Sequence, residues 1–307
     1  MERIVLGIDG GGTKTRCLAA DGAGRILGEG LSGPSNYQVV GLEAAAGAVR
    51  AAAEAALAAT GVALDEVAAV CAGLAGVGRP EDQAAMREAL ACFGQARLEV
   101  VPDARVALAG ALAGQPGVVV ISGTGSIAFG LDGHGQTHRA GGWGWILGDE
   151  GSGYQIGRQA LVAALAAQDG TGSETSLTWR ICEAWGLERL DQAIRRVYSD
   201  LPKAKADMAA LAPTVLAAAD AGDAVARAIL VQAGSDLGNL AAAVLRKLQL
   251  PAGVPELVTI IGGVGNGSAV VREALRERLA RLAPGARSID CLEGPAEGAV
   301  RMACALL

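Results

Sequence analysis

The stretch IVLGIDGGGTKT, from Ile4 to Thr15, joins an apolar run to one acid, three glycines and a Thr-Lys-Thr end. Glycines let backbone N–H groups approach a phosphate oxygen closely, and threonine hydroxyls add further donors. An acid beside such an anion site is explained if a divalent cation lies between Asp9 and the phosphates, and Mg²⁺ is the first candidate for that cation. The alternative is a glycine-rich turn without chemical meaning, in which Asp9 only caps the turn.

This loop differs from the two phosphate motifs that open a helix. A Walker loop needs a lysine where Thr13 stands, and a dinucleotide fingerprint needs a third glycine where Thr15 stands. The residues that follow, TRCLAADGAGRILGEG (15–30), contain two short apolar runs around a DGAG turn, which predicts a β-hairpin. Phosphate would therefore be held by a turn between two antiparallel strands, without a helix dipole.

The same layout recurs in VVVISGTGSIAFGLDGHGQTHRAGG, from Val118 to Gly142. Each copy runs from an apolar strand through a Gly/Thr loop and a second strand to a DGxG turn, at 21–24 and at 132–135. Chance similarity of two glycine turns is the alternative, but loop, strand and turn agree in order. The repeat predicts two domains of like topology, whose phosphate loops lie on facing walls of a cleft.

Alternating helix and strand patterns fill the remainder of the chain. We expect helices at about 42–60, 80–92 and 104–113, and several more between about 152 and 248. Strands are expected at 67–74, 98–101 and 257–261, and a last helix at 295–307 is expected to pack back on the first domain. A three-strand meander followed by αβα units predicts an α/β domain with a central mixed sheet. A Gly/Pro break at 113–117 separates an N-terminal domain, 1–113 plus about 292–307, from a C-terminal domain, 114–291, with a helical insertion.

Composition argues against several classes of protein. The chain of 307 residues is 51% hydrophobic and 19% charged, which is typical of a folded protein. Its net charge is -6 and no Lys/Arg cluster stands out, so no nucleic-acid partner is expected. Charged residues interrupt the Ala-rich stretch 41–60, so no membrane span is expected there. Met1-Glu2-Arg3 runs directly into a strand pattern, so we expect no signal peptide and a cytoplasmic location.

Cysteine and histidine usage limits the chemistry. None of the six cysteines forms a CxxC pair, so we expect reduced thiols packed as small hydrophobes. The two histidines, His134 and His138, are too few for a His-based metal site or a catalytic triad near the loops. Carboxylates, hydroxyls and backbone amides are therefore expected to carry the chemistry.

The segment GGWGWILGDEGSGY, from Gly141 to Tyr154, is more specific than either loop. This segment resembles the N-acetylglucosamine kinase branch of the BadF/BadG/BcrA/BcrD ATPases, in the sugar kinase, Hsp70 and actin superfamily. The resemblance extends in order along nearly the whole chain, through the motifs IDGGGTKT, GPSNY, AGLAG, VPDA, SGTGS, IGGVGNGS and GPAEGA. The resemblance implies an α/β fold of two actin-like (ribonuclease H-like) domains flanking an ATP/sugar cleft. It implies a cytoplasmic, commonly dimeric, ATP-dependent kinase for N-acetylglucosamine at its 6-hydroxyl, with glucosamine or N-acetylmuramic acid as the alternative substrate.

The resemblance also implies roles for single residues. Asp9 would hold Mg²⁺ through water, and Asp103 of VPDA would be the catalytic base. The residues implied for ATP are Gly11, Gly12, Thr13, Lys14, Thr124, Gly262, Gly263 and Asn266. Those implied for the sugar are Asn36, Asp103, Ser126, Gly142, Trp143, Gly144 and Asp149. Mg²⁺, amide donors and one carboxylate base suffice for phosphoryl transfer, which needs positioning and charge neutralisation more than covalent chemistry.

Simpler roles stay open for three of these side chains and for Glu150. Asp103 and Asp149 are each followed by a predicted helix that they could cap. A tryptophan such as Trp143 is more often part of a core. Glu150 is better explained as an acid in the first turn of a helix than as a catalytic group.

Related families offer three competing functions. An ATP-driven activator of a 2-hydroxyacyl-CoA dehydratase would need two cysteines per chain after the second phosphate loop for a [4Fe–4S] cluster. No cysteine lies between Cys92 and Cys182, which argues against that activity. The cysteine cluster of ROK-type sugar kinases is also missing. An actin-like nucleotide switch would leave Asn36 and Asp149 without a purpose.

Overall fold

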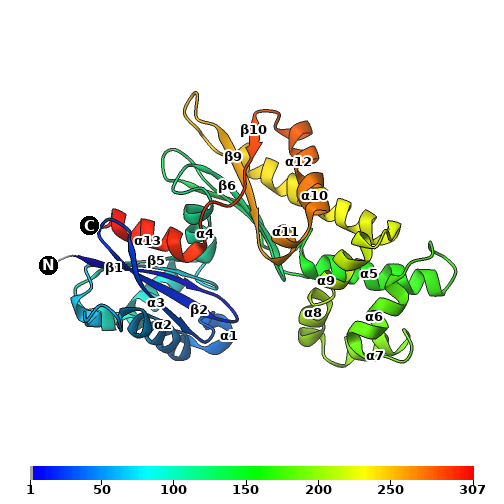
Figure 1. Cartoon of the computed structure of the whole chain (residues 1–307), viewed down its shortest axis with the longest axis horizontal. Helices are drawn as coiled ribbons and strands as arrows, with labels where there is room; N and C mark the ends of the chain where they lie inside the picture. Colours follow the sequence, from blue (N-terminus) through cyan, green and yellow to red (C-terminus); the bar gives the residue numbers. More distant parts are fainter. Residues whose placement is uncertain (1–2) are drawn as a thin grey trace. The chain divides into compact units, whose positions relative to one another are not determined.

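The computed structural model describes residues 3–307, which form two compact units (Figure 1). The first unit runs up to Gln115 and also includes Asp290–Leu307, whereas the second spans Pro116–Ile289. The expectation that the chain has no signal peptide concerns its first residues, of which Met1 and Glu2 lie outside the described part. The first unit is therefore built from both ends of the chain.

A five-stranded mixed sheet with the order β3-β2-β1-β4-β5 forms the centre of the first unit. Its antiparallel meander consists of β1 (Ile4–Gly10), β2 (Thr15–Asp21) and β3 (Ile26–Ser32). The strands β4 (Ala69–Leu74) and β5 (Arg97–Pro102) run parallel to β1. The predicted mixed sheet is confirmed.

Helices cover both faces of this sheet. They are α1 (Tyr37–Val40), α2 (Leu42–Leu57), α3 (Pro80–Ala89), α4 (Asp103–Ala111) and α13 (Pro295–Ala305), with short 3-10 turns η1 (Leu64–Glu66) and η2 (Ala91–Phe93). The alanine face of α2 packs with β1 and β3 in one apolar core, and α13 packs against β1 and α4 in a second. Figure 1 shows α13, in red, beside the blue strands of the N-terminus. The prediction that the last helix packs on the first domain is confirmed.

The second unit repeats the sheet of the first. Its five strands follow the order β10-β9-β6-β7-β8. The antiparallel strands are β6 (Gly117–Ser122), β7 (Ser126–Leu131) and β8 (Thr137–Gly141), and β9 (Glu256–Ile261) and β10 (Ala286–Ser288) continue in parallel. Read from the meander outward, the two strand orders are identical.

The two DGxG turns also match in detail. The Asp21 carboxylate accepts hydrogen bonds from the backbone N–H groups two and four residues later, at 3.0 and 2.9 Å. Asp132 accepts from the N–H groups at the same two spacings, both at 2.8 Å. An aspartate that binds the backbone in this way fixes the turn. The repeat predicted from the sequence is therefore structural and not a chance similarity.

Eight helices of the described chain belong to the second unit. They are α5 (Gly153–Gln168), α6 (Leu177–Trp185), α7 (Gln192–Ser199), α8 (Leu201–Ala209), α9 (Ala212–Asp220), α10 (Ala224–Leu245), α11 (Gly263–Gly267) and α12 (Ala269–Leu282). Within residues 3–307, α10 alone is long and apolar enough to cross a membrane by length and composition. Of the most apolar 18-residue stretch of α10, 56% is buried inside the structure. The buried side chains of α10 belong to the core of the second unit.

Candidate functional site

The loop between β1 and β2 is a tight turn that presents its tip to solvent. The N–H of Gly11 donates to the carbonyl of Lys14 at 3.0 Å, which closes the turn. Gly12, Thr13 and Lys14 are exposed. Buried Thr15 anchors the base, because its hydroxyl lies 2.8 Å from the carbonyl oxygen of Gly33. The loop therefore leaves backbone amides, a hydroxyl and an ammonium free to meet an anion.

Two carboxylates lie at the same edge of the first sheet. Asp9 on β1 is paired with Gly73 on β4, which is paired with Val101 on β5. Asp103 follows two residues after Val101, so both acids are at the carboxyl ends of parallel strands, where α/β sheets place their ligands. Burial raises the pKa of Asp9 to about 6, and the charge of Asp103 contributes to that rise. The two groups are thus close enough to interact.

Asp103 is the first residue of α4. Its Oδ1 accepts a hydrogen bond from the N–H of Ala104 at 2.8 Å. Burial raises the pKa of the Asp103 carboxyl, and backbone hydrogen bonds offset part of the rise. Pro102 takes the N-cap position. Among the described residues no side chain pairs with this carboxylate, which leaves it available to a ligand.

The oxygen donors of the first unit fit a magnesium ion that also binds phosphate. Within residues 3–307, no three His, Cys, Asp or Glu side chains form a group that could hold a metal by themselves. Mg²⁺ in phosphoryl-transfer sites is commonly held by one or two carboxylates together with substrate phosphates and waters. Asp9, with Asp103 beside it, supplies that kind of partial donor set.

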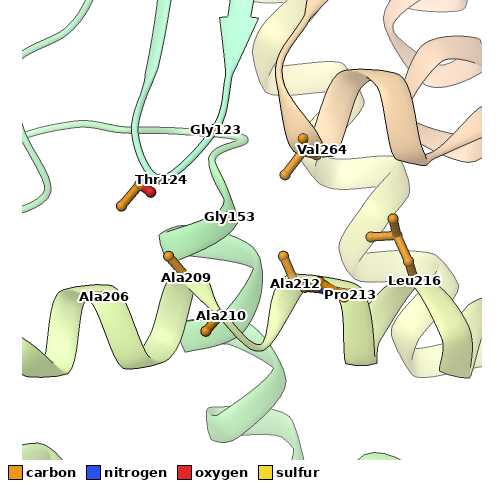
Figure 2. Close-up of a pocket in the computed structure, with 11 residues that line it drawn as sticks. Gly123, Thr124, Gly153, Ala206, Ala209, Ala210, Ala212, Pro213, Leu216 and Val264 are labelled. Atoms are coloured by element: carbon orange, nitrogen blue, oxygen red, sulfur yellow. The ribbon is translucent and has the colours of Figure 1, made fainter. Parts of the chain in front are cut away.

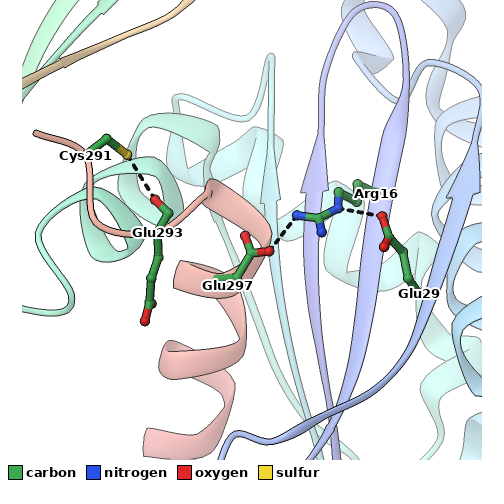
Figure 3. A network of polar contacts seen from close by, with 5 residues as sticks. All are labelled: Arg16, Glu29, Cys291, Glu293 and Glu297. Carbon is green, nitrogen blue, oxygen red and sulfur yellow. Dashed lines mark hydrogen bonds and ion pairs between the residues drawn. The ribbon is translucent and has the colours of Figure 1, made fainter. Parts of the chain in front are cut away.

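Arg16 is a residue near Asp9 that the sequence analysis did not identify. It is the direct cross-strand partner of Asp9 on β2. Its guanidinium donates to Glu29 and to Glu297, each at 2.8 Å (Figure 3). Glu297 belongs to the GPAEGA motif at the start of α13. The network ties the C-terminal helix to the strand pair that carries the phosphate loop, and it places a fixed cation near Asp9.

Asn36 lies next to the same loop. Its backbone N–H donates to the carbonyl of Gly11 at 3.2 Å, and its side-chain Oδ1 accepts from the N–H of Gln38 at 3.2 Å. As the N-cap of α1, Asn36 is held in one orientation. The GPSNY motif therefore lies at the phosphate loop.

The loop between β6 and β7 is the counterpart in the second unit. The N–H of Gly123 donates to the carbonyl of Gly125 at 3.0 Å. The carbonyl of Gly123 accepts from the N–H of Gly153, at the start of α5, at 2.8 Å. Thr124, at the tip, is exposed. The loop is thus fixed by a helix N-terminus and keeps its threonine free.

A cavity of about 430 Å³ lies beside Thr124 (Figure 2). Small or apolar residues form most of its wall: Gly123, Thr124, Gly153, Ala206, Ala209, Ala210, Ala212, Pro213, Leu216, Gly263 and Val264. This volume is typical of a small-molecule pocket. An apolar chamber that ends at a Gly/Thr loop suits a flat base with a phosphate chain attached.

Of three residues that the resemblance implied for ATP, one lines this cavity, one directly precedes that residue in the chain and one lies outside the wall. Gly263 lines it, and Gly262 immediately precedes Gly263. Gly262 has a φ of 98°, and a Cβ there would lie 2.3 Å from the carbonyl oxygen of Ser122, so only glycine fits. Asn266 is exposed on α11 and is not part of the wall. The wall residues of α8 and α9 were not anticipated from the sequence.

Asp149 and Ser126 come together at the base of the second loop. Asp149 is 4% exposed, and its Oδ1 accepts a hydrogen bond from the N–H of Ser126 at 3.2 Å. The hydroxyl of Ser126 donates to the carbonyl of Glu150 at 2.7 Å. Ser152, not Asp149, caps α5 by accepting from the N–H of Gln155 at 3.2 Å. The alternative role of Asp149 as a helix cap is therefore wrong, and so is that of Glu150 as a first-turn acid, since the first turn of α5 contains none.

The remaining sugar-segment residues form an exposed turn. The N–H of Gly142 donates to the carbonyl of Ser126 at 3.0 Å, which joins the turn to the Asp149 cluster. Trp143 is 64% exposed, with the Arg139 guanidinium 4.8 Å from its ring centroid, so a core role for this tryptophan is wrong. Gly144 accepts from the N–H of Leu147 at 3.2 Å. In the described part of the chain, no hydrogen bond or ion pair joins Trp143 or Gly144 to Asp149.

The fold and the two loops define an α/β protein of two actin-like domains. The profile of the BadF/BadG/BcrA/BcrD ATPase family matches residues 6–303, and the chain belongs to this family.

Relatives match over nearly the full length. An N-acetylmuramic acid/N-acetylglucosamine kinase of Clostridium acetobutylicum is 34% identical over 302 residues, which cover 98% of each chain. An N-acetyl-D-glucosamine kinase of Dictyostelium discoideum is 32% identical over 312 residues, also 98% of each. The crystal structure of a putative N-acetylglucosamine kinase from Chromobacterium violaceum is similar with a TM-score of 0.74 and 32% identity, covering 98% of this chain and 99% of that one.

Proposed function

We propose that this chain is an ATP-dependent kinase that transfers the γ-phosphoryl group to an amino sugar, with the 6-hydroxyl of N-acetylglucosamine as the preferred acceptor. The observation that carries the proposal is the carboxylate pair Asp9 and Asp103 at one sheet edge, each with a pKa raised by burial. Two relatives that match over nearly the whole chain are named as kinases of N-acetylated amino sugars, which supports the acceptor class.

Asp103 is assigned the role of general base. Its carboxylate has no side-chain partner in the described chain, and burial raises its pKa toward the range in which a base works at neutral pH. It would accept the proton of the attacking sugar hydroxyl. Asp9 would hold Mg²⁺ through water, and the bound ion would neutralise charge on the phosphates.

The nucleotide is assigned to the loops and to the cavity of the second unit. Its base and ribose would fill the cavity walled by α8 and α9, near Gly262 and Gly263, with Asn266 at the outer end of α11. The phosphates would be bound by Thr124 from the second unit. The first unit would add the N–H of Gly12 and the side chains of Thr13 and Lys14. The N–H of Gly11 closes the turn that presents these groups to the phosphates.

The acceptor is assigned to polar groups and one exposed ring. Asn36 of the first unit would bind a hydroxyl through its side-chain amide. In the second unit the donors and acceptors would be Ser126, Gly142, Gly144 and Asp149. The exposed face of Trp143 offers a flat apolar wall to the sugar ring.

N-acetylmuramic acid is the second candidate acceptor, because the relative from Clostridium acetobutylicum is named for both sugars. Glucosamine is a further alternative within the same class. We also propose a cytoplasmic homodimer, as the family resemblance implies.

A coupled ADP-release screen tests the proposed function. The full chain is assayed with ATP and Mg²⁺ against a panel of amino sugars and hexoses. We expect slow basal ADP release that an amino sugar accelerates, N-acetylglucosamine first. Basal release with every sugar of the panel would contradict the kinase assignment.

A further inference from the structure

Asp149 is a buried carboxylate, and only one of its two oxygens accepts a hydrogen bond in the described part of the chain. Its Oδ1 accepts from the N–H of Ser126, but its buried Oδ2 has no hydrogen-bond partner in the described part of the chain. The Nζ of Lys205 lies 3.5 Å from Oδ2 and forms an ion pair with it. An ionised group is retained in a buried place only when its charge is paired. Lys205 is therefore the cation that lies against the otherwise unpartnered oxygen of Asp149.

The backbone of Asp149 is also held in an uncommon conformation. Its φ of 65° lies in the left-handed region, which residues other than glycine seldom adopt. A Cβ on Gly125 would lie 2.8 Å from Asp149 Oδ1, so the carboxylate packs directly on the phosphate loop. Such a conformation persists only when the surroundings fix it. The contacts to Ser126 and Lys205 provide that fixation.

Lys205 comes from a helix that also forms the wall of the nucleotide cavity. On α8, Ala206 and Ala209 line the cavity near Thr124 (Figure 2). Residues four apart share one face of a helix, so Lys205 and Ala209 lie on the same side of α8. One helix thus contacts the cavity proposed for adenosine and pairs with the acid proposed for the sugar.

We propose that Lys205 is a positioning residue that orients the Asp149 carboxylate to accept a hydrogen bond from a sugar hydroxyl. Through α8, Lys205 also couples the nucleotide cavity to Asp149. The inference rests on the proposed function for the identity of the two ligands. A nucleotide packed on Ala206 and Ala209 restrains α8 and therefore restrains the ammonium of Lys205. Asp149 is then pre-organised for the sugar. Nucleotide and sugar bind with positive coupling, and this coupling is reciprocal.

The same helix provides a matched control. Lys203 is an exposed lysine two residues earlier on α8. Lys203→Met removes the same charge and the same polar group as Lys205→Met, but it leaves the pair with Asp149 intact. Lys205→Arg keeps a cation at the pair, and Lys205→Gln is a second neutral variant should Lys205→Met fail to fold.

Calorimetry of N-acetylglucosamine binding, with and without a non-hydrolysable ATP analogue, tests the coupling. We expect the analogue to tighten sugar binding to the wild type by roughly 5- to 150-fold, the usual range of allosteric coupling. In Lys205→Met this factor falls to about 1 and the sugar KM rises at least about 10-fold, while kcat changes much less. Lys205→Arg restores most of the coupling.

Two results overturn the inference, and they are distinguishable. If the wild type shows coupling and Lys205→Met behaves like Lys203→Met, the role of Lys205 is wrong while the proposed function stands. If the wild type binds no amino sugar even with the analogue present, the proposed function fails and the coupling fails with it.

Discussion

Asp103→Asn separates catalysis from local structure in the first unit. The amide keeps the shape of the carboxylate, and its Oδ1 can still accept the hydrogen bond from Ala104 N–H, which is 2.8 Å long in the structure. What the change removes is the capacity to take a proton. Asparagine is also about as good as aspartate near a helix start, so α4 is expected to stay folded.

The size of the effect follows from the assigned role. Loss of a general base typically costs about 10²–10⁴-fold in rate, equivalent to roughly 2.7–5.4 kcal/mol in the barrier. The charge of Asp103 helps to raise the pKa of Asp9 to about 6. Its removal lowers the pKa of Asp9, so that group is more fully ionised at neutral pH. Mg²⁺ is therefore expected to bind as well as before, or better, while kcat collapses.

Steady-state ADP release at saturating ATP and sugar, with Mg²⁺ titrated, measures both quantities. Glu81→Gln is the matched control, because Glu81 is an exposed acid in the first turn of α3 in the same unit. Its kcat is expected to stay near that of the wild type. Near-normal kcat in Asp103→Asn would contradict the role of Asp103 as general base and leave it only as a partner of the helix backbone.

Three further changes test the second unit. Gly262→Ala places a Cβ 2.3 Å from the carbonyl oxygen of Ser122 at a φ of 98°, so urea unfolding should show a loss of about 1–3 kcal/mol, and an unchanged midpoint would contradict the strain. Ala209→Phe fills the cavity beside Thr124, so ATP affinity measured by calorimetry should fall at least about 10-fold, whereas unchanged affinity would place the nucleotide elsewhere. Burial raises the pKa of Asp223, but hydrogen bonds from the Thr175 and Ser176 segment and from the start of α10 outweigh it and lower the pKa from 3.8 to about 2. The stability that ionised Asp223 contributes is present above pH 3.8 and is lost as the pH falls toward 2. The free energy of unfolding of the wild type should therefore exceed that of Asp223→Asn by about 1 kcal/mol, after allowance for partial exposure, and this difference should vanish over that interval. A difference in unfolding free energy that stays constant with pH would contradict the prediction.

The features that sequence reasoning anticipated are those with local signals. The hairpin with its DGxG turn is encoded in a few adjacent residues, and its recurrence indicated two like units. The register of β1, β4 and β5, which brings Asp9 and Asp103 to one edge, comes from the structure. The elements that were missed include the short helices α1 and α11, the helix α12 and the short strand β10. The strand β10 has only three residues, so its pattern is too short to identify.

Features that depend on tertiary contacts were not accessible from the sequence. The cavity wall of α8 and α9 consists largely of alanines, which carry no chemical signature of a binding site. The pairs Arg16–Glu297 and Lys205–Asp149 join residues far apart in the chain. The capping role suggested for Asp149 was wrong because Ser152, three residues later, supplies a better-placed oxygen.

The chemical fate of the γ-phosphoryl group distinguishes a sugar kinase from an ATPase. The full chain is incubated with ATP, Mg²⁺ and N-acetylglucosamine, and the products are followed by ³¹P NMR and mass spectrometry. We expect ADP and a sugar monophosphate ester in equal amounts, with the phosphate on the 6-oxygen of the sugar. ADP accompanied by inorganic phosphate and unmodified sugar would contradict it.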